Sequence, residues 1–300
     1  LKRKLLVNLI IVPFRAPKSA KEYKKLFKLG GGESPLLAYS KSLQQKVKNL
    51  AGHKFDVELA MRYGDPSMDE VLKNMQTKNY DEIIIFPLYP QYASASSGSS
   101  IEKALKIINK WWVMPEIKII GQFYDDIRYL NCIKKRAEVF NLKNYDHVLF
   151  SYHGLPERHV NKVHLDGKPC SDHQCEDEVN ESNKYCYKAT CYATTRYLAA
   201  LLDINDEIYT TSFQSRLGND PWITPFTDHV VEKLAKNGCK RLLVFSPAFV
   251  ADCLETTIEI AEENLRIFKE YGGDVLDLVP SLNDGDDWGK CIVDMVNEHV

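Results

Sequence analysis

Residues 147–159 read HVLFSYHGLPERH, and this stretch decides the fold. Its first six residues form a short apolar run, which is typical of a parallel β-strand buried on both faces. The run breaks at His153-Gly154, and Pro156 cannot continue it. Parallel sheets bind their ligands just beyond the carboxyl ends of the strands, which is where His153 is expected to lie.

The rest of the chain repeats this pattern of apolar runs separated by helical segments. The four runs of the first half are Leu5–Leu9, Val57–Arg62, Glu82–Pro87 and Ile117–Phe123. Those of the second half are His147–Tyr152, Glu207–Phe213, Arg241–Pro247 and Asp274–Pro280. Helical periodicity is expected over residues 34–48, 99–110, 227–236, 252–271 and 287–299. Such alternation predicts open α/β sheets with parallel strands.

The two halves match each other, so the sequence predicts two similar Rossmann-like domains with a cleft between them. Each domain is expected to be a four-stranded parallel sheet flanked by helices. We assign residues 1–130 to the first domain and 131–282 to the second, with 283–300 as a helix that packs back on the first. One continuous eight-stranded sheet is the alternative, but it would make the internal symmetry accidental.

Composition limits the class of protein. A chain of 300 residues with 44% hydrophobic and 27% charged residues has the usual make-up of a soluble globular protein. Its net charge of −2 argues against nucleic-acid binding, for which a basic chain is usual. No apolar run approaches the roughly 18–20 residues that span a bilayer, and no signal peptide is recognisable. These features predict a cytoplasmic protein.

Two features place chemistry at the strand ends of the second half. An imidazole at position 153 can act as a base or as a metal ligand, although a random histidine is more often packed and hydrogen-bonded. Carboxylates recur at spacings of three or four residues after the third strand: Asp252, Glu255, Glu259 and Glu263. A solvated acidic face is the usual reason for such a stripe. This one begins at a helix N-terminus beside the predicted cleft, so it is suited to a divalent metal or to proton transfer.

Aromatic and small polar residues gather near the same strand ends. They are Tyr89, Tyr92, Ser94, Phe213, Trp222 and Phe249. Aromatic side chains here are explained by core packing, but beside a cleft they would also suit a flat, apolar ligand.

Several long motifs resemble the ferrochelatases, enzymes that insert ferrous iron into a porphyrin. The motifs are SYHGLPERH (151–159), SFQSRLGNDPWITPFTD (212–228), AFVADCLETTIEI (248–260), FPLYPQYASASSGSS (86–100), GGESPL (31–36) and FRAPKSA (14–20). They occur in the family's order over most of the chain. The family's fold, two similar Rossmann-like domains, agrees with the pattern above.

The resemblance implies roles for individual residues. His153 matches the family's invariant histidine and Glu255 its essential glutamate, and the two would bind the substrate iron or take up the pyrrole protons. Asp252 and Glu259 would support them on the acidic face. The porphyrin-binding positions are Arg62, Tyr63, Tyr92 and Ser94.

The implied reaction is insertion of Fe²⁺ into protoporphyrin IX, which yields protohaem and releases two protons without an organic cofactor. Coproporphyrin, or another tetrapyrrole and metal such as cobalt, is the alternative within the same fold group. A two-domain metal-binding protein is the alternative from a different class.

Four of the eight cysteines lie close together: Cys170, Cys175, Cys186 and Cys191. Four thiolates suit either tetrahedral zinc or a [2Fe–2S] cluster, and disulfides are disfavoured in a reducing compartment. His164 and His173 are nearby alternative ligands. Some bacterial ferrochelatases hold a [2Fe–2S] cluster in this region, so the resemblance favours a cluster here.

The N-terminal region departs from the family. The first strand is normally followed by a Gly-Thr-Pro turn and some tens of residues, whereas Leu9 here runs directly into Ile10, so we infer that a loop is missing between them. The basic stretch FRAPKSAKEYKKLFK (14–28) would contact porphyrin propionates or a membrane surface, and a solvated helix face explains it equally well.

Overall fold

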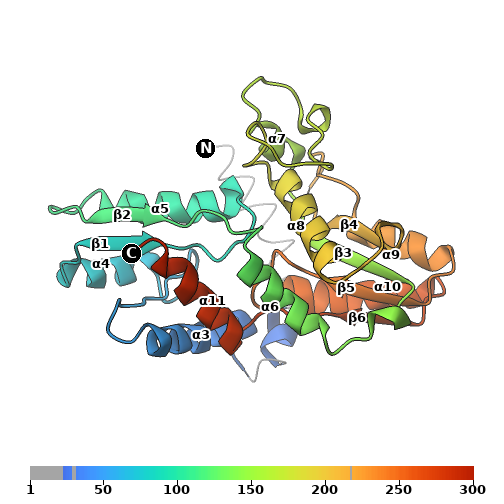
Figure 1. Ribbon diagram of the computed structural model, residues 1–300, viewed down its shortest axis with the longest axis horizontal. Helices are drawn as coiled ribbons and strands as arrows, with labels where there is room; N and C mark the ends of the chain where they lie inside the picture. The colour runs from blue at the N-terminus through green and yellow to red at the C-terminus, as the bar shows by residue number, and fades with distance from the viewer. Residues whose placement is uncertain (1–22, 29–31, 217) are drawn as a thin grey trace.

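The structure, a computed structural model, describes residues 23–28, 32–216 and 218–300 (Figure 1). Its strands are β1 (Glu82–Ile85), β2 (Glu116–Ile119), β3 (His147–His153), β4 (Tyr209–Gln214), β5 (Arg241–Phe245) and β6 (Val275–Leu278). Its α-helices are α3 (Pro35–Ala51), α4 (Met68–Thr77), α5 (Ser99–Ile108), α6 (Ile127–Ala137), α7 (Glu157–Asn161), α8 (Tyr187–Leu201), α9 (Thr227–Lys236), α10 (Leu265–Glu270) and α11 (Asp286–Asn297). Two π-helices are η2 (Ser94–Gly98) and η6 (Glu255–Asn264), and short 3₁₀ turns are η3 (Leu142–Asn144), η4 (Cys170–Asp172) and η5 (Asp206–Ile208).

The second half forms a four-stranded parallel sheet in the order β4-β3-β5-β6. All four strands coincide with runs predicted from the sequence; β3 and β5, at the centre of the sheet, are mainly apolar, as strands buried on both faces should be, whereas β4 (YTTSFQ) is richer in polar residues. Leu149 packs with α9, η6 and α10 on one face, whereas Val148 and Phe150 pack on the other face with α6, α8 and α11. The predicted α/β architecture is therefore confirmed for this half.

The first half differs from the prediction in the described residues. Only β1 and β2 form a sheet there, and they are parallel. Residues 57–62, predicted as a strand, make only an isolated bridge between Met61 and Ser67. The first predicted strand, Leu5–Leu9, lies outside the described residues, as do the inferred missing loop and residues 14–22. A four-stranded first sheet thus remains a prediction.

Helix α11 joins the two halves of the molecule. It packs against α3 and α6, and it lies between the two sheets in Figure 1. The guanidinium of Arg136 on α6 donates to both carboxylate oxygens of Asp287 on α11. Trp288, which is fully buried, stacks on Phe123 with ring centroids 5.8 Å apart. The C-terminal helix therefore contacts elements from both halves of the chain.

No helix in the described part of the chain is long and apolar enough to cross a membrane.

Candidate active site and metal centre

His153 is the last residue of β3 and lies at the carboxyl end of the sheet, as the sequence predicts. The side chain is partly buried, and its Nδ1 lies 2.6 Å from the carbonyl oxygen of Gly154. Because a carbonyl can only accept a hydrogen bond, this contact places the proton on Nδ1 and leaves the Nε2 lone pair free. A neutral imidazole with a free Nε2 can accept a proton or bind a metal ion.

Gln214, at the end of β4, connects His153 to the acidic helix. It pairs with His153 in the sheet register, and its carbonyl accepts the Gly154 N–H at 2.7 Å. Its side-chain oxygen accepts from Ser151 at 2.8 Å, and its amide nitrogen donates to the Glu255 carbonyl at 3.4 Å. One buried side chain therefore sets β3 and the start of η6 relative to each other.

Glu255 begins helix η6, and Glu259 follows one turn later. Burial raises the pKa of the Glu259 carboxyl, a hydrogen bond from Ser215 opposes this, and the negative charge of Glu255 adds to it. His153, when protonated, lowers the pKa of this carboxyl, so the imidazole and the two glutamates share one electrostatic environment. The wide π-helical turn is a rare conformation that often marks functional sites.

Asp252 is placed differently from the other predicted carboxylates. It precedes η6, and its carboxylate accepts from Asn283 Nδ2 at 2.7 Å and from Thr256 Oγ1 at 3.1 Å. These bonds fasten the start of the helix to the loop that follows β6. Asp252 therefore has a visible structural role.

Aromatic residues from the first half lie near Glu255. Burial raises the pKa of the Tyr89 hydroxyl, and the groups that act on it include Tyr63, Glu255 and Arg62. Arg62 stacks 4.6 Å from the centroid of the Tyr63 ring, and 77% of the Tyr63 surface is exposed. Burial and the Glu255 charge also raise the pKa of Tyr23, on the helical segment 23–28. Aromatic groups from the first half thus share the surroundings of Glu255.

Tyr92 and Ser94 lie around the start of η2. The Tyr92 ring packs edge-on against Tyr185, with centroids 6.1 Å apart, and Ser94 is exposed. Tyr185 belongs to the segment that carries the clustered cysteines, so Tyr92 lies where that segment meets the first half of the chain.

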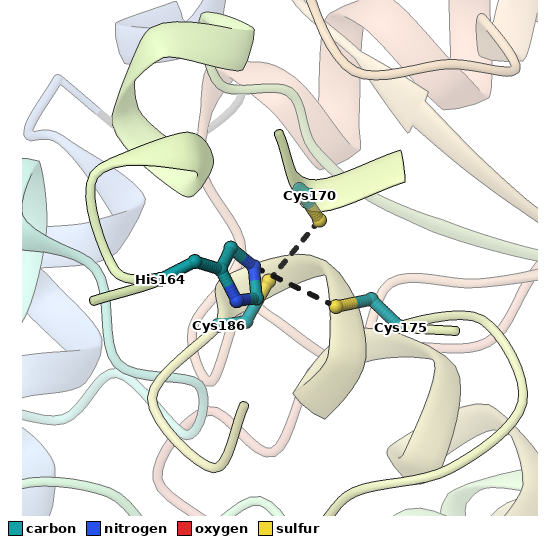
Figure 2. A group of neighbouring side chains, drawn as sticks. All are labelled: His164, Cys170, Cys175 and Cys186. Atoms are coloured by element: carbon teal, nitrogen blue, oxygen red, sulfur yellow. Dashed lines mark hydrogen bonds between the residues drawn. The ribbon is translucent and has the colours of Figure 1, made fainter. Parts of the chain in front are cut away.

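Three of the four clustered cysteines meet one histidine. His164, Cys170, Cys175 and Cys186 are all buried, and their ligand atoms lie within 4.8 Å of one another (Figure 2). The Cys170 and Cys186 sulfurs are 3.4 Å apart, and His164 Nε2 lies 3.8 Å from the Cys175 sulfur. This donor set suits a metal centre.

Cys191 does not join this group, although its spacing in the sequence predicts that it should. Helix α8 begins at Tyr187, directly after Cys186, so Cys191 lies five residues further along the helical path and is rotated by about 140°. Its side chain is fully buried in the hydrophobic core instead. His164, considered from the sequence only as an alternative ligand, occupies the fourth position.

The surroundings of the group also fit a metal. Hydrogen bonding from the Cys170 thiol lowers the pKa of Cys186, which favours a thiolate at that position. His164 Nδ1 is buried and has no hydrogen-bond partner among the described residues. The His164 ring stacks on His173 at 3.8 Å, and His173 Nε2 lies 3.2 Å from Asp166 Oδ1. The ring is therefore held in place with its Nε2 directed at the sulfurs.

Comparison with known proteins identifies the family. The ferrochelatase family model matches residues 1–300. The chain is 40% identical over 301 residues to the ferrochelatase of Legionella pneumophila strain Corby, covering 99% of this chain and 88% of that one. It is 39% identical over 293 residues to the ferrochelatase of Bdellovibrio bacteriovorus, covering 97% and 86%.

Solved structures agree on the fold. SirB from Bacillus subtilis with Fe³⁺ matches with a TM-score of 0.55 at 12% identity, over 89% of this chain and 91% of SirB. CbiX, the terminal enzyme for siroheme biosynthesis in denitrifying bacteria, matches with a TM-score of 0.53 at 14% identity, over 89% and 93%. These likenesses confirm the two-domain α/β architecture of chelatases. The full-length family match and the identity to curated relatives establish that this chain belongs to the ferrochelatase family.

Proposed function

We propose that this ferrochelatase inserts Fe²⁺ into protoporphyrin IX and releases two protons, in haem biosynthesis. The observation that carries this proposal is the convergence of His153, Glu255 and Glu259 at the strand ends of the second sheet, held there by Gln214. We also propose that the porphyrin binds in a cleft between domains 1–130 and 131–282, with residues 283–300 packed on the first domain.

In this proposal, His153 is the group that accepts a pyrrole proton or binds the incoming iron at Nε2. Glu255, at the start of η6, takes part in binding the cation or in removing the second proton. Glu259, whose pKa is raised mainly by burial, can hold a proton beside them. Arg62 and Tyr63 would contact the porphyrin, as would Tyr92 and Ser94 at the start of η2.

We further propose that His164, Cys170, Cys175 and Cys186 hold a resident [2Fe–2S] cluster. Three buried thiols and an imidazole are a donor set known for iron–sulfur centres, in which histidine can replace cysteine. The cluster would supply a one-electron redox centre or a structural brace. A single zinc ion is the second candidate, because the ligand atoms are already close enough to surround one tetrahedral ion.

The identity of the resident metal is tested by the absorption spectrum and metal content of the anaerobically purified protein. A cluster gives a red-brown chromophore with two irons per chain, whereas zinc gives a colourless protein with one ion. His164→Ala should lower the metal content, and Cys191→Ser should leave it unchanged. Loss of metal in Cys191→Ser alone would contradict the ligand set.

The substrate is tested by anaerobic iron insertion into three tetrapyrroles, namely protoporphyrin IX, coproporphyrin and sirohydrochlorin. We expect the highest kcat/KM with protoporphyrin IX, measured from the absorption bands of the metallated product. A clear preference for coproporphyrin or sirohydrochlorin would replace the proposed substrate. Tight iron binding with no insertion into any of them would instead indicate a metal-binding protein.

A further inference from the structure

The residues on both sides of Cys186 contact other parts of the molecule, including two residues of the candidate active site. The Lys184 carbonyl accepts a hydrogen bond from Gln122 Nε2 at 3.2 Å, and the Tyr185 ring packs against Tyr92. On the other side, the Tyr187 hydroxyl donates to the carbonyl oxygen of His153 at 2.9 Å. A segment that supplies a metal ligand is thus bonded directly to the predicted catalytic residue.

With the bond from Tyr187, one peptide group is hydrogen-bonded at both its carbonyl and its N–H. The carbonyl of the His153–Gly154 peptide is held by Tyr187, and its N–H is held by the Gln214 carbonyl at 2.7 Å. This peptide joins His153 to Gly154, whose own carbonyl is bonded to His153 Nδ1, so its orientation affects the imidazole through the backbone of these two residues. Tyr187 is 7% exposed, so its hydroxyl would lose a needed partner if this contact opened.

Cys186 controls where Tyr187 lies. It is the N-cap of α8, and its carbonyl accepts the Thr190 N–H at 3.0 Å. Tyr187 is the first residue of the helix, so it has little freedom once Cys186 is fixed. The rest of the ligand set comes from the segment between α7 and α8, where η4 is the only helix or strand. Hydrogen bonds such as that of the Cys186 N–H to the Asn183 carbonyl at 2.7 Å already hold this side, and metal ligation would add a direct constraint on the start of α8.

We propose that Tyr187 is a positioning residue that couples the metal centre to His153. Metal bound at Cys186 fixes the first turn of α8, and Tyr187 then holds the His153–Gly154 peptide, which is next to the Gly154 carbonyl that orients the imidazole. Loss of the metal loosens this peptide and lowers the rate of chelation, so that the enzyme responds to the state of its own metal centre. This inference rests on the metal centre and on the role of His153 proposed above.

Hydrogen–deuterium exchange tests the coupling without an activity measurement. We expect chelator treatment of the parent protein to increase deuterium uptake in peptides covering residues 150–155. Tyr187→Phe should show increased uptake while its metal content stays at the parent level. Tyr197→Phe, on the exposed side of the same helix, is the matched control and should behave like the parent. Unchanged uptake after metal removal, or in Tyr187→Phe, would overturn the inference.

Kinetics then separate positioning from folding. Loss of one hydrogen bond predicts a fall in kcat of about fivefold to tenfold in Tyr187→Phe, with the KM for porphyrin unchanged. Removing the metal should lower kcat less in Tyr187→Phe than in the parent, since the coupling is already broken. Independent, multiplicative losses would overturn the inference, as would purified parent protein that contains and takes up no metal. An inactive parent that still shows the exchange response would refute the proposed function and leave the coupling supported.

Discussion

At the scale of single residues, the position of His153 could be predicted from its place after a buried strand. The residue that assembles the site could not. Gln214 lies in the motif of residues 212–228, but its bonds to the Gly154 N–H and the Glu255 carbonyl depend on chain segments that meet only in the folded protein. The spacing of residues in a sequence shows the periodicity within one helix or strand. It does not show how far that helix or strand lies from another one.

Gly154 is expected to tolerate no side chain. A Cβ at this position would lie 2.8 Å from the Gln214 carbonyl oxygen and 3.2 Å from Trp222 Cε3, both closer than ordinary contacts. We expect Gly154→Ala to destabilise the fold by about 1–3 kcal/mol and to reduce activity, as measured by denaturant unfolding and porphyrin metallation. Gly121→Ala is the control, because its Cβ would meet nothing within 4 Å. Equal stability of the two variants would show that β3 and β4 approach less closely.

Glu259 is expected to make stability depend on pH. Burial raises its pKa above the ordinary value of 4.5, so the folded chain retains a proton that the unfolded chain has lost. The free energy of unfolding therefore falls as the pH rises from the pKa of Glu259 in the unfolded chain to its pKa in the folded chain. The cost of burying the ionised carboxylate persists at neutral pH. We expect Glu259→Gln to have a higher Tm than the parent at pH 7 and an equal Tm near pH 4. Glu263→Gln, at the exposed end of the stripe, removes only the smallest contribution to this pKa and should change the Tm far less, and a Tm of Glu259→Gln below the parent at pH 7 would contradict this account.

At the scale of elements, the strands of the second sheet could be predicted from the sequence. The π-helix at residues 255–264 and the lack of strand pairing at residues 57–62 within the described part of the chain could not. Continuous apolar runs identify buried parallel strands, so β3 to β6 could be located from the sequence. Carboxylates every three or four residues predict an α-helix over 252–271, but residues 255–264 form a π-helix followed by α10. Both helix types place such residues near one face, so the spacing does not distinguish them. In the first half, residues 57–62 have no paired strand among the described residues.

The contact between α6 and α11 offers a test at this scale. Arg136 and Asp287 form a bidentate pair whose side chains are only 16% and 22% exposed. The guanidinium lowers the pKa of the Asp287 carboxyl against the effect of burial, so the pair stabilises the fold at neutral pH and is lost as the carboxyl becomes protonated in acid. We expect Asp287→Asn to cost about 1.5–3 kcal/mol in urea unfolding at pH 7.

Asp286→Asn is the control for this pair. Asp286 bonds to Lys46 but is 92% exposed, so its loss should cost under about 1 kcal/mol. Equal costs for the two variants would show that α11 is not fastened to α6 through Arg136.

At the scale of the whole molecule, the segment between α7 and α8 stands apart from the two sheets. The chain between α7 and α8 forms a protrusion over the second sheet in Figure 1 and supplies all four side chains of the candidate metal centre. The clustering of cysteines predicted a metal centre from the sequence. That His164, and not Cys191, lies beside the other three cysteines was not predictable, because it depends on where α8 begins.

Removal of the metal should open this segment. We expect chelator-treated protein to be cut by trypsin at Lys162, Lys168 or Lys184 much faster than the metal-loaded protein, and to have a lower Tm. Cleavage within α9 should be equally slow in both forms, which serves as the internal control. Identical digestion patterns with and without metal would show that the segment is held by its protein contacts alone.

The central claim is that His153 and Glu255 carry out metal insertion. Its most direct test is kcat for anaerobic Fe²⁺ insertion into protoporphyrin IX by the parent, His153→Ala, Glu255→Gln and the control Glu263→Gln. We predict an active parent and control, and losses of at least about 100-fold in His153→Ala and Glu255→Gln without loss of folding. Undiminished kcat in either of these two variants would contradict the assignment of the active site.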